Sequence, residues 1–247
     1  MKVAGVGLTD VGQKRKNNED AFFVDNDRGV FVVADGMGGH KGGEVASRTA
    51  IETVVRALTP DAIAKAESDS ARDRVSQVVG DALAGANTQI RERASADPAL
   101  KGMGCTLSLM FCVGDRAMVG HVGDTRIYRR RDGVVAQLTE DHTFVSELVR
   151  RGTVDPANVH RHPHGNVLTR AVGSRDNLDV DTLLIDLRAG DRFLLCSDGL
   201  TKYVESDETL YEPLAVADFA TIPEALVRWA NESGGGDNVT VIVIEVS

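Results

Sequence analysis

The chain has 247 residues, of which 42% are hydrophobic, and a formal net charge of -9 at pH 7. This length is enough for one well-buried domain. The acidic balance argues against general binding to nucleic acid or to anionic membranes, and no run reaches the roughly 20 apolar residues that a membrane-spanning helix needs.

Apolar patterns in the first hundred residues predict strands followed by helices. We expect a strand over residues 2–8 and a hairpin of strands over 21–25 and 30–35. Apolar residues at helical spacing predict two amphipathic helices over 44–58 and 71–94. These two helices should cover one face of a sheet.

The second half of the chain returns mainly to strands. The sequence predicts an antiparallel meander over 105–113, 116–122, 126–131 and 134–138, then a short helix over 143–151 and an irregular, histidine-rich stretch over 153–166. We expect a mobile flap insertion at about 143–166. Further strands are expected at 182–187, 192–197 and 239–244. Helices are expected at about 207–216 and 223–233, the latter with a capping box of Thr221 and Glu224.

The cysteines and the N-terminal residues bear on the compartment. Cys105, Cys112 and Cys196 all lie in apolar runs, which predicts buried thiols rather than disulfides. The first residues lack the features of a signal peptide. We therefore expect a cytoplasmic protein.

Three aspartates stand beside glycine at the ends of apolar strands. Asp35 and Asp198 each end an apolar run and precede a glycine, and Asp237 lies between a triple glycine and the last strand. A buried carboxylate is costly without a cation, and glycine lets the carbonyl of Gly36 approach the same ion. Oxygen ligands favour Mg²⁺ or Mn²⁺ over Zn²⁺. One Asp-Gly pair alone is usually a turn, but three predict a shared metal centre, and a bridging acid could hold two ions roughly 3.5–4 Å apart.

A polar run near the N-terminus supplies further candidate site residues. Arg15 can hold two phosphate oxygens at once, and Glu19 and Asp20 can orient water bound to a metal. Such a run is more often a solvated loop, so it gains weight only from the acids described above.

These motifs, taken in order, resemble the metal-dependent, or type 2C, serine/threonine protein phosphatases in their compact bacterial form. The resemblance covers nearly the whole chain. It rests on the blocks Gly12-Gln13-Lys14-Arg15, Asn18-Glu19-Asp20, Val33-Ala34-Asp35-Gly36-Met37-Gly38-Gly39, Gly104-Cys105-Thr106, Gly120-His121-Val122-Gly123-Asp124-Thr125-Arg126-Ile127-Tyr128, Leu138-Thr139-Glu140-Asp141-His142, Leu168-Thr169-Arg170-Ala171-Val172-Gly173, Leu195-Cys196-Ser197-Asp198-Gly199-Leu200 and Asp237-Asn238-Val239-Thr240.

The resemblance implies an α+β fold and a metal site. The fold would be a single domain over residues 1–247, a four-layer α-β-β-α sandwich of two antiparallel sheets flanked by helices. By this analogy Asp35 bridges two Mn²⁺ or Mg²⁺ ions, the carbonyl of Gly36 binds one of them, and Asp198 and Asp237 bind the other.

The resemblance also implies a reaction. Arg15 would bind the substrate phosphate, and Glu19 and Asp20 would act through metal-bound water. A metal-activated water or hydroxide would attack phosphoserine or phosphothreonine directly, without a phosphoenzyme. The partners implied are phosphorylated proteins, including a eukaryotic-like kinase and its substrates, with no nucleic acid.

Two parts of the family pattern stay open in this sequence. Asp124 matches the position that helps hold a third ion in bacterial relatives, but a turn aspartate explains it about equally well. Met37 stands where many eukaryotic relatives have a histidine, so the general acid is left unassigned. His40 lies nearby in the sequence, but metal-bound water could serve instead.

Two other patterns have simpler interpretations. His160, His162 and His164 alternate as Zn²⁺ ligands can, but Pro163 and the loop context favour a solvated flap edge. The basic run over 126–131 is best explained as exposed strand charge.

Two rival functions remain. One is a regulator in a partner-switching system, which the presence of Arg15 argues against. The other is a binding module that has lost catalysis, which the complete set of acids argues against.

Overall fold

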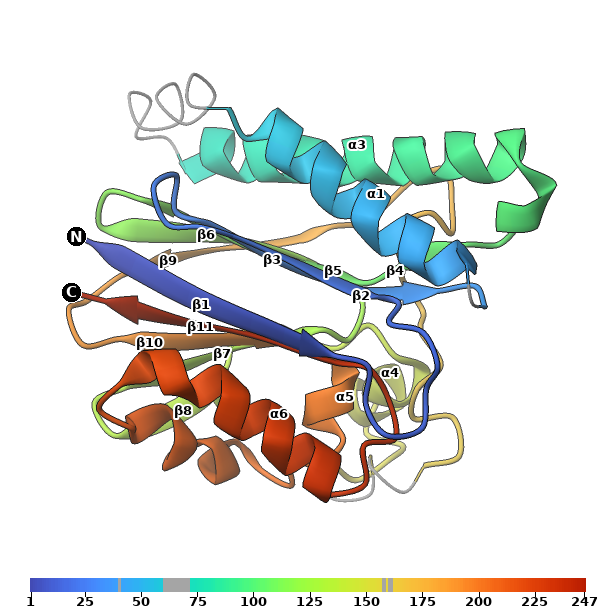
Figure 1. Cartoon of the computed structure of the whole chain (residues 1–247). Coiled ribbons are helices and arrows are strands. Elements are labelled where there is room, and N and C mark those ends of the chain that lie inside the picture. The colour runs from blue at the N-terminus through green and yellow to red at the C-terminus, as the bar shows by residue number, and fades with distance from the viewer. Residues whose placement is uncertain (40, 60–71, 157–158, 160–161) are drawn as a thin grey trace.

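The computed structural model describes residues 1–39, 41–59, 72–156, 159 and 162–247. Within these ranges two antiparallel sheets pack face to face and carry helices on both outer faces (Figure 1). One sheet has the strand order β1-β11-β10-β7-β8 and the other β2-β3-β5-β6-β9, with β4 paired to β3. The strands are β1 Val3–Asp10, β2 Asp20–Asp25, β3 Val30–Met37, β4 Gly104–Cys105, β5 Leu107–Val113, β6 Arg116–Val122, β7 Arg126–Arg131, β8 Val134–Gln137, β9 Asp181–Asp186, β10 Arg192–Cys196 and β11 Val239–Val246. The predicted α-β-β-α sandwich is confirmed.

The helices divide between the two outer faces. As predicted, the two long helices α1 (Lys41–Ala57) and α3 (Arg72–Ala96) lie together on the sheet that contains β3 and β6. On the other sheet, α6 (Ile222–Glu232) packs against β11 and β1, and the short α5 (Asp198–Thr201) contacts β10 and β11. In the described ranges, none of the helices has the length and apolar character that a membrane crossing requires.

The central strands are apolar on both faces because each is buried from both sides. In β3, Val30, Val32 and Ala34 pack under α1 and α3, whereas Phe31 and Val33 face the opposite sheet. The same alternation with a period of two runs through β10 and β11. A continuous apolar run therefore indicates a strand in the middle of this sandwich, and the polar residue at its end stands at the rim.

The predicted meander of four strands is wrong. Strand β6 pairs with β5 and β9, and β7 lies in the other sheet between β10 and β8. Gly123, with a φ of 111°, therefore begins a connection between the sheets and not a hairpin. Hairpins and crossovers use the same turn residues, so the sequence pattern did not separate them. Asp124 consequently lies on the segment that links the two sheets.

Two predicted helix features are also wrong. The segment predicted as a helix over 207–216 forms two 3₁₀ turns, η3 (Asp207–Leu210) and η4 (Pro213–Ala215). Proline at the start of η4 has no N–H to continue the preceding turn. The capping box is absent because Thr221 ends the turn η5 (Phe219–Thr221), where its hydroxyl donates to the carbonyl of Asp218.

The remaining short helix agrees with the sequence prediction. Helix α4 (Phe144–Arg150) begins after Thr143, whose hydroxyl accepts from the N–H of Ser146 at 3.2 Å. It is followed by Gly152, which has a φ of 71°. The flap boundaries given above stay a prediction.

We predict that Phe31→Ala lowers the free energy of unfolding by about 3–5 kcal/mol, because this fully buried ring fills the space between the sheets opposite Gly5. Urea denaturation measures the loss. Val134→Ala, at a side chain that is 63% exposed, is the control and should change stability by less than about 0.5 kcal/mol. Equal losses in the two variants would contradict the assigned core.

Candidate metal centre and active site

A cleft of about 580 Å³ opens where β3 and β10 end and β11 begins. All the site residues predicted from the sequence line it, except Asp20, which lies behind its wall. Those that line the cleft are Arg15, Glu19, Asp35, Gly36, Asp124, Asp198 and Asp237. Residues far apart in the sequence thus share one cavity, as the metal-centre hypothesis requires.

Asp35 and Gly36 are held by the backbone around the end of β3. The N–H of Asp35 donates to the Thr106 hydroxyl at 3.1 Å, and the N–H of Thr106 donates to the Asp35 carbonyl at 2.8 Å. A Cβ on Gly36 would lie 2.1 Å from the carbonyl oxygen of Gly43, so only glycine fits between β3 and α1. Strand β3 continues to Met37, two residues beyond the predicted end at Asp35.

Asp198 begins α5, and Ser197, which stands between β10 and Asp198, links the two sheets. The Ser197 hydroxyl donates to Asp20 Oδ2 at 2.7 Å and accepts from the N–H of Thr240 at 3.0 Å. Asp20 is only 9% exposed, and it pairs across β2 and β3 with Asp35. The carboxylate of Asp20 therefore ties the sheet of β3 to the sheet of β10 behind the cleft.

Asn238 fastens the N-terminal polar loop beside the cleft. Its side-chain oxygen accepts from the N–H of Glu19 at 2.8 Å, and its amide donates to the carbonyls of Val11 and Asn17, each at 2.9 Å. The loop also donates from Gln13 to the carbonyl of Gly235 at 2.8 Å. This packing brings the two chain ends together and presents Arg15 and Glu19 to the cleft.

Asp237 is paired with two cationic side chains. Arg15 Nε lies 2.8 Å from Asp237 Oδ1, and Arg15 Nη2 donates to Oδ2 at 2.8 Å. Lys202 Nζ lies 3.3 Å from the same Oδ2 and 4.0 Å from Asp198 Oδ1. Burial alone would raise the pKa of Asp237, but the hydrogen bond from Arg15 and the charge of Lys202 lower it.

The other acids are not compensated in this way. Burial, with added repulsion from Asp20, Asp198 and Asp124, raises the pKa of Asp35 well above its ordinary value. Burial and the neighbouring acids raise the pKa of Asp124 to about 7 and that of Asp20 to about 6. The pKa of Asp198 is also raised, first by burial. The cleft therefore holds more negative charge than its cations neutralise.

This donor set fits hard divalent cations, because it consists of carboxylates and backbone carbonyls without an imidazole or thiolate. Among the described residues, no three acidic, histidine or cysteine side chains stand ready in a coordination shell around one point. Asp237 is instead engaged by Arg15 and Lys202. Ion binding would have to reorient these carboxylates, and relief of their mutual repulsion would favour it.

Several residues of the cleft were not singled out from the sequence. Lys202 follows no motif, and only its position one turn after Asp198 could have suggested a role. Arg170 belongs to a block that the resemblance quotes, but no role was assigned to it. Asn166, at the end of the predicted flap, lines the cleft beside Asp124.

The histidine hypotheses fall partly outside the described residues. His40, the considered proton donor, and His160 are not described. His162 and His164 pack instead around exposed Phe144, with ring centroids 6.4 and 6.2 Å away. In the described part of the chain, no group of three potential ligands forms a zinc site.

The basic run over 126–131 is not simply exposed charge. Arg126 forms a bidentate pair with Asp141, with its Nη2 2.7 Å from Oδ2, and both side chains are mostly buried. Arg131 pairs with buried Asp191 at 2.5 Å. Arg130 lies over the ring of Tyr211, with 4.9 Å to its centroid. These arginines therefore stabilise the fold, which leaves the acidic balance as the argument against nucleic-acid binding.

Comparison with known proteins identifies the family. The family model for protein phosphatase 2C matches residues 11–237. The serine/threonine protein phosphatase PstP of Mycobacterium tuberculosis is 37% identical over 96% of this chain, and the chain spans 44% of the length of that relative. The protein phosphatase PhpP of Streptococcus pneumoniae is 35% identical, over 97% of this chain and 96% of its own length.

Solved structures agree with the fold. A crystal structure of Mycobacterium tuberculosis PstP is similar with a TM-score of 0.91, 35% identity and full coverage of both chains. A structure of the PstP catalytic domain in complex with two manganese ions has a TM-score of 0.81 and 35% identity, and it covers 99% of this chain and 98% of that one. The chain therefore belongs to the protein phosphatase 2C family of metal-dependent serine/threonine protein phosphatases.

Proposed function

We propose that this chain hydrolyses phosphoserine and phosphothreonine in proteins, with two Mn²⁺ or Mg²⁺ ions in the cleft and water as the direct nucleophile. The observation that supports this most strongly is the meeting of Asp35, Asp198 and Asp237 in one cleft, with Arg15 on its wall. Asp35 would bridge the ions, the carbonyl of Gly36 would bind one, and the other two acids would bind the second. When bound, such ions lower the pKa of water and offset charge on phosphoryl oxygens.

Arg15 would orient the substrate. A guanidinium presents parallel N–H donors that match two oxygens of a phosphate. In this structure both donors are directed to Asp237. Asp237 can serve either Arg15 or a cation, so metal loading would free the guanidinium for the phosphate. The same carboxylate would thereby link metal binding to substrate binding.

The remaining acids would have supporting roles. Glu19 lines the cleft and Asp20 supports its wall through Ser197, so both would act through ordered water and neighbouring side chains rather than on the phosphate. Asp124 faces the same cavity as Asp198, and we propose that it helps hold a third, weaker ion. Asn166 could add an oxygen there.

The complete set of acids together with Arg15 supports an active phosphatase over a partner-switching regulator or an inactive binding module. Its substrates would be phosphorylated proteins. By analogy with the family, they would include a eukaryotic-like serine/threonine kinase and the targets of that kinase.

Asp198→Asn should reduce hydrolysis of a phosphothreonine peptide in Mn²⁺ by at least ~100-fold, because it removes a charged ligand from the cleft. Steady-state release of phosphate measures the loss. Asp132→Asn is the matched control: this aspartate is 84% exposed in a turn at a φ of 51°, which asparagine tolerates. An Asp198→Asn enzyme as active as the control, or a native enzyme unaffected by chelator, would refute the proposal.

Arg15→Lys should raise the KM for the phosphopeptide about 10-fold, because lysine keeps the charge but loses the two-point contact with phosphate. Arg15→Ala should raise it further. The affinity for Mn²⁺ should not fall in either Arg15 variant, because the metal then meets less competition from residue 15 for the carboxylate of Asp237. A lower Mn²⁺ affinity with an unchanged KM would assign Arg15 to support of the metal ligands instead.

The raised pKa of Asp124 predicts how stability depends on pH in the metal-free protein. The folded pKa of about 7 lies above the ordinary value, so this group favours folding below about pH 4 and loses that contribution as the pH rises through 7. In chelator, Asp124→Asn should therefore be more stable than the native chain at pH 8, by at most a few kcal/mol, and the difference should shrink toward pH 4.

Urea denaturation at the two pH values makes this measurement. Saturating Mn²⁺ should reduce or reverse the advantage of Asp124→Asn, because the native carboxylate then has a cation. A difference that does not depend on pH would contradict the electrostatic account of the cleft.

A further inference from the structure

The position of Asp124 is set by the backbone that carries it. Among the described residues, no side chain donates a hydrogen bond to its carboxylate. The turn at Gly123 is tightly enclosed, since a Cβ there would lie 2.5 Å from Thr106 Cβ. Whatever holds this turn therefore determines where the carboxylate lies in the cleft.

His142 holds the turn at both polar groups of Gly123. The His142 N–H donates to the Gly123 carbonyl at 2.8 Å, and the Gly123 N–H donates to His142 Nδ1 at 3.1 Å. The imidazole is only 2% exposed. Because Nδ1 accepts a hydrogen bond, the proton of the neutral ring lies on Nε2.

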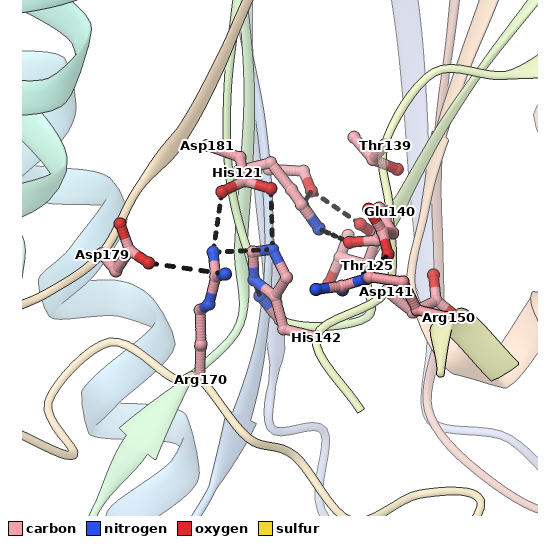
Figure 2. A network of polar contacts seen from close by, with 12 residues as sticks. His121, Thr125, Thr139, Glu140, Asp141, His142, Arg150, Arg170, Asp179 and Asp181 are labelled. Atoms are coloured by element: carbon pink, nitrogen blue, oxygen red, sulfur yellow. Dashed lines mark hydrogen bonds and ion pairs between the residues drawn. The ribbon is translucent and has the colours of Figure 1, made fainter. Parts of the chain in front are cut away.

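The far side of the imidazole faces the carboxylate of Asp181 and the guanidinium of Arg170, as Figure 2 shows. His142 Nε2 lies 3.0 Å from Asp181 Oδ2, and Arg170 Nη1 donates to Asp181 Oδ1 at 2.7 Å. Arg170 also pairs with Asp179 at 3.4 Å. Arg170 Nη1 also lies 3.2 Å from His142 Nε2, so both donors converge on the same carboxylate. Asp181 accepts hydrogen bonds from Nε2–H and from Arg170, which fixes the tautomer that leaves Nδ1 free to accept from Gly123.

The three residues that precede His142 contact the strands on both sides of the turn. Asp141 binds Arg126 through two oxygens, and the Thr139 hydroxyl accepts from the N–H of Ile127 at 3.1 Å. The carbonyl of Glu140 accepts from His121 Nε2 at 3.0 Å. Residues 139–142 therefore lie along the connection between the sheets, and among them His142 binds Gly123, the residue next to Asp124 in the sequence.

We propose that His142 is a positioning residue, which holds the Gly123 turn so that the Asp124 carboxylate faces Asp198 and which thereby sets the affinity of the cleft for its weakest divalent ion. The part of this inference that concerns the ion rests on the proposed function. The part that concerns the turn does not, because it depends only on contacts within the chain.

Two variants separate the contacts of His142. Asparagine can place an oxygen near the position of Nδ1 and so keep the acceptor for Gly123, while it loses the link to Asp181. Glutamine can place an amide near the position of Nε2 and so keep the donor to Asp181, while it loses the acceptor for Gly123. Asp179→Asn, at an acid that is 78% exposed, is the control.

The first measurement is hydrogen exchange of the Gly123 amide in the metal-free protein, followed by NMR. His142→Gln should accelerate exchange at least ~10-fold, and His142→Asn should stay within about threefold of the native chain. The control should not change. Equal exchange in both His142 variants would overturn the proposed hold on the turn.

The second measurement is Mn²⁺ binding in a double-mutant cycle, with free Mn²⁺ followed by electron paramagnetic resonance. His142→Gln alone should lower the affinity for the most weakly bound Mn²⁺ about 10-fold. In an Asp124→Asn background it should have no further effect on Mn²⁺ affinity. Additive losses would mean that His142 acts only on general stability and would overturn the positioning role.

The two measurements also separate this inference from the proposed function. If Asp124→Asn leaves Mn²⁺ binding unchanged, the third ion and the link from His142 to metal binding both fail, whereas the exchange result still decides the hold on the turn. Thermal unfolding of each variant, and retention of its tighter Mn²⁺ binding, identify a variant that has simply failed to fold.

Discussion

Repulsion among acidic side chains at one rim of the sandwich is the constraint on which this structure depends. Asp35 comes from one sheet, Asp198 and Asp237 from the ends of strands in the other, and Asp124 from the segment between the sheets. Burial prevents water from screening these charges, so the pKa of Asp35 is well above its ordinary value. A fold that keeps such a cluster has a destabilised rim unless cations enter it.

The protein holds this rim together with neutral and paired groups behind the acids. Ser197 joins the carboxylate of Asp20 to the backbone of β11, and Asn238 fastens the N-terminal loop to the opposite end of the chain. Arg15 and Lys202 compensate mainly Asp237, and Lys202 also lies 4.0 Å from Asp198. Asp237 is thus engaged by protein cations, whereas burial and the neighbouring acids raise the pKa of Asp35, Asp124 and Asp198. Under the proposed function, metal binding, substrate binding and stability would be coupled through the same carboxylates.

Much of this was predictable from sequence because burial on both faces produces continuous apolar runs. Those runs located the central strands and the acids at their ends, and the ordered motifs gave the fold. The prediction of a four-strand meander was wrong because a turn at Gly123 can lead either into a hairpin or across to the other sheet. The proposed role of His142 was not predictable, since its partners Asp181 and Arg170 are remote from it in the sequence.

The most direct test of the central claim is anomalous X-ray diffraction from crystals of the protein grown with Mn²⁺, measured at the manganese absorption edge. The account predicts two strong peaks in the cleft, with Asp35 in contact with both and Asp237 moved from Arg15 to a metal. Peaks elsewhere, or a cleft without manganese in which Asp237 keeps its pair with Arg15, would contradict it.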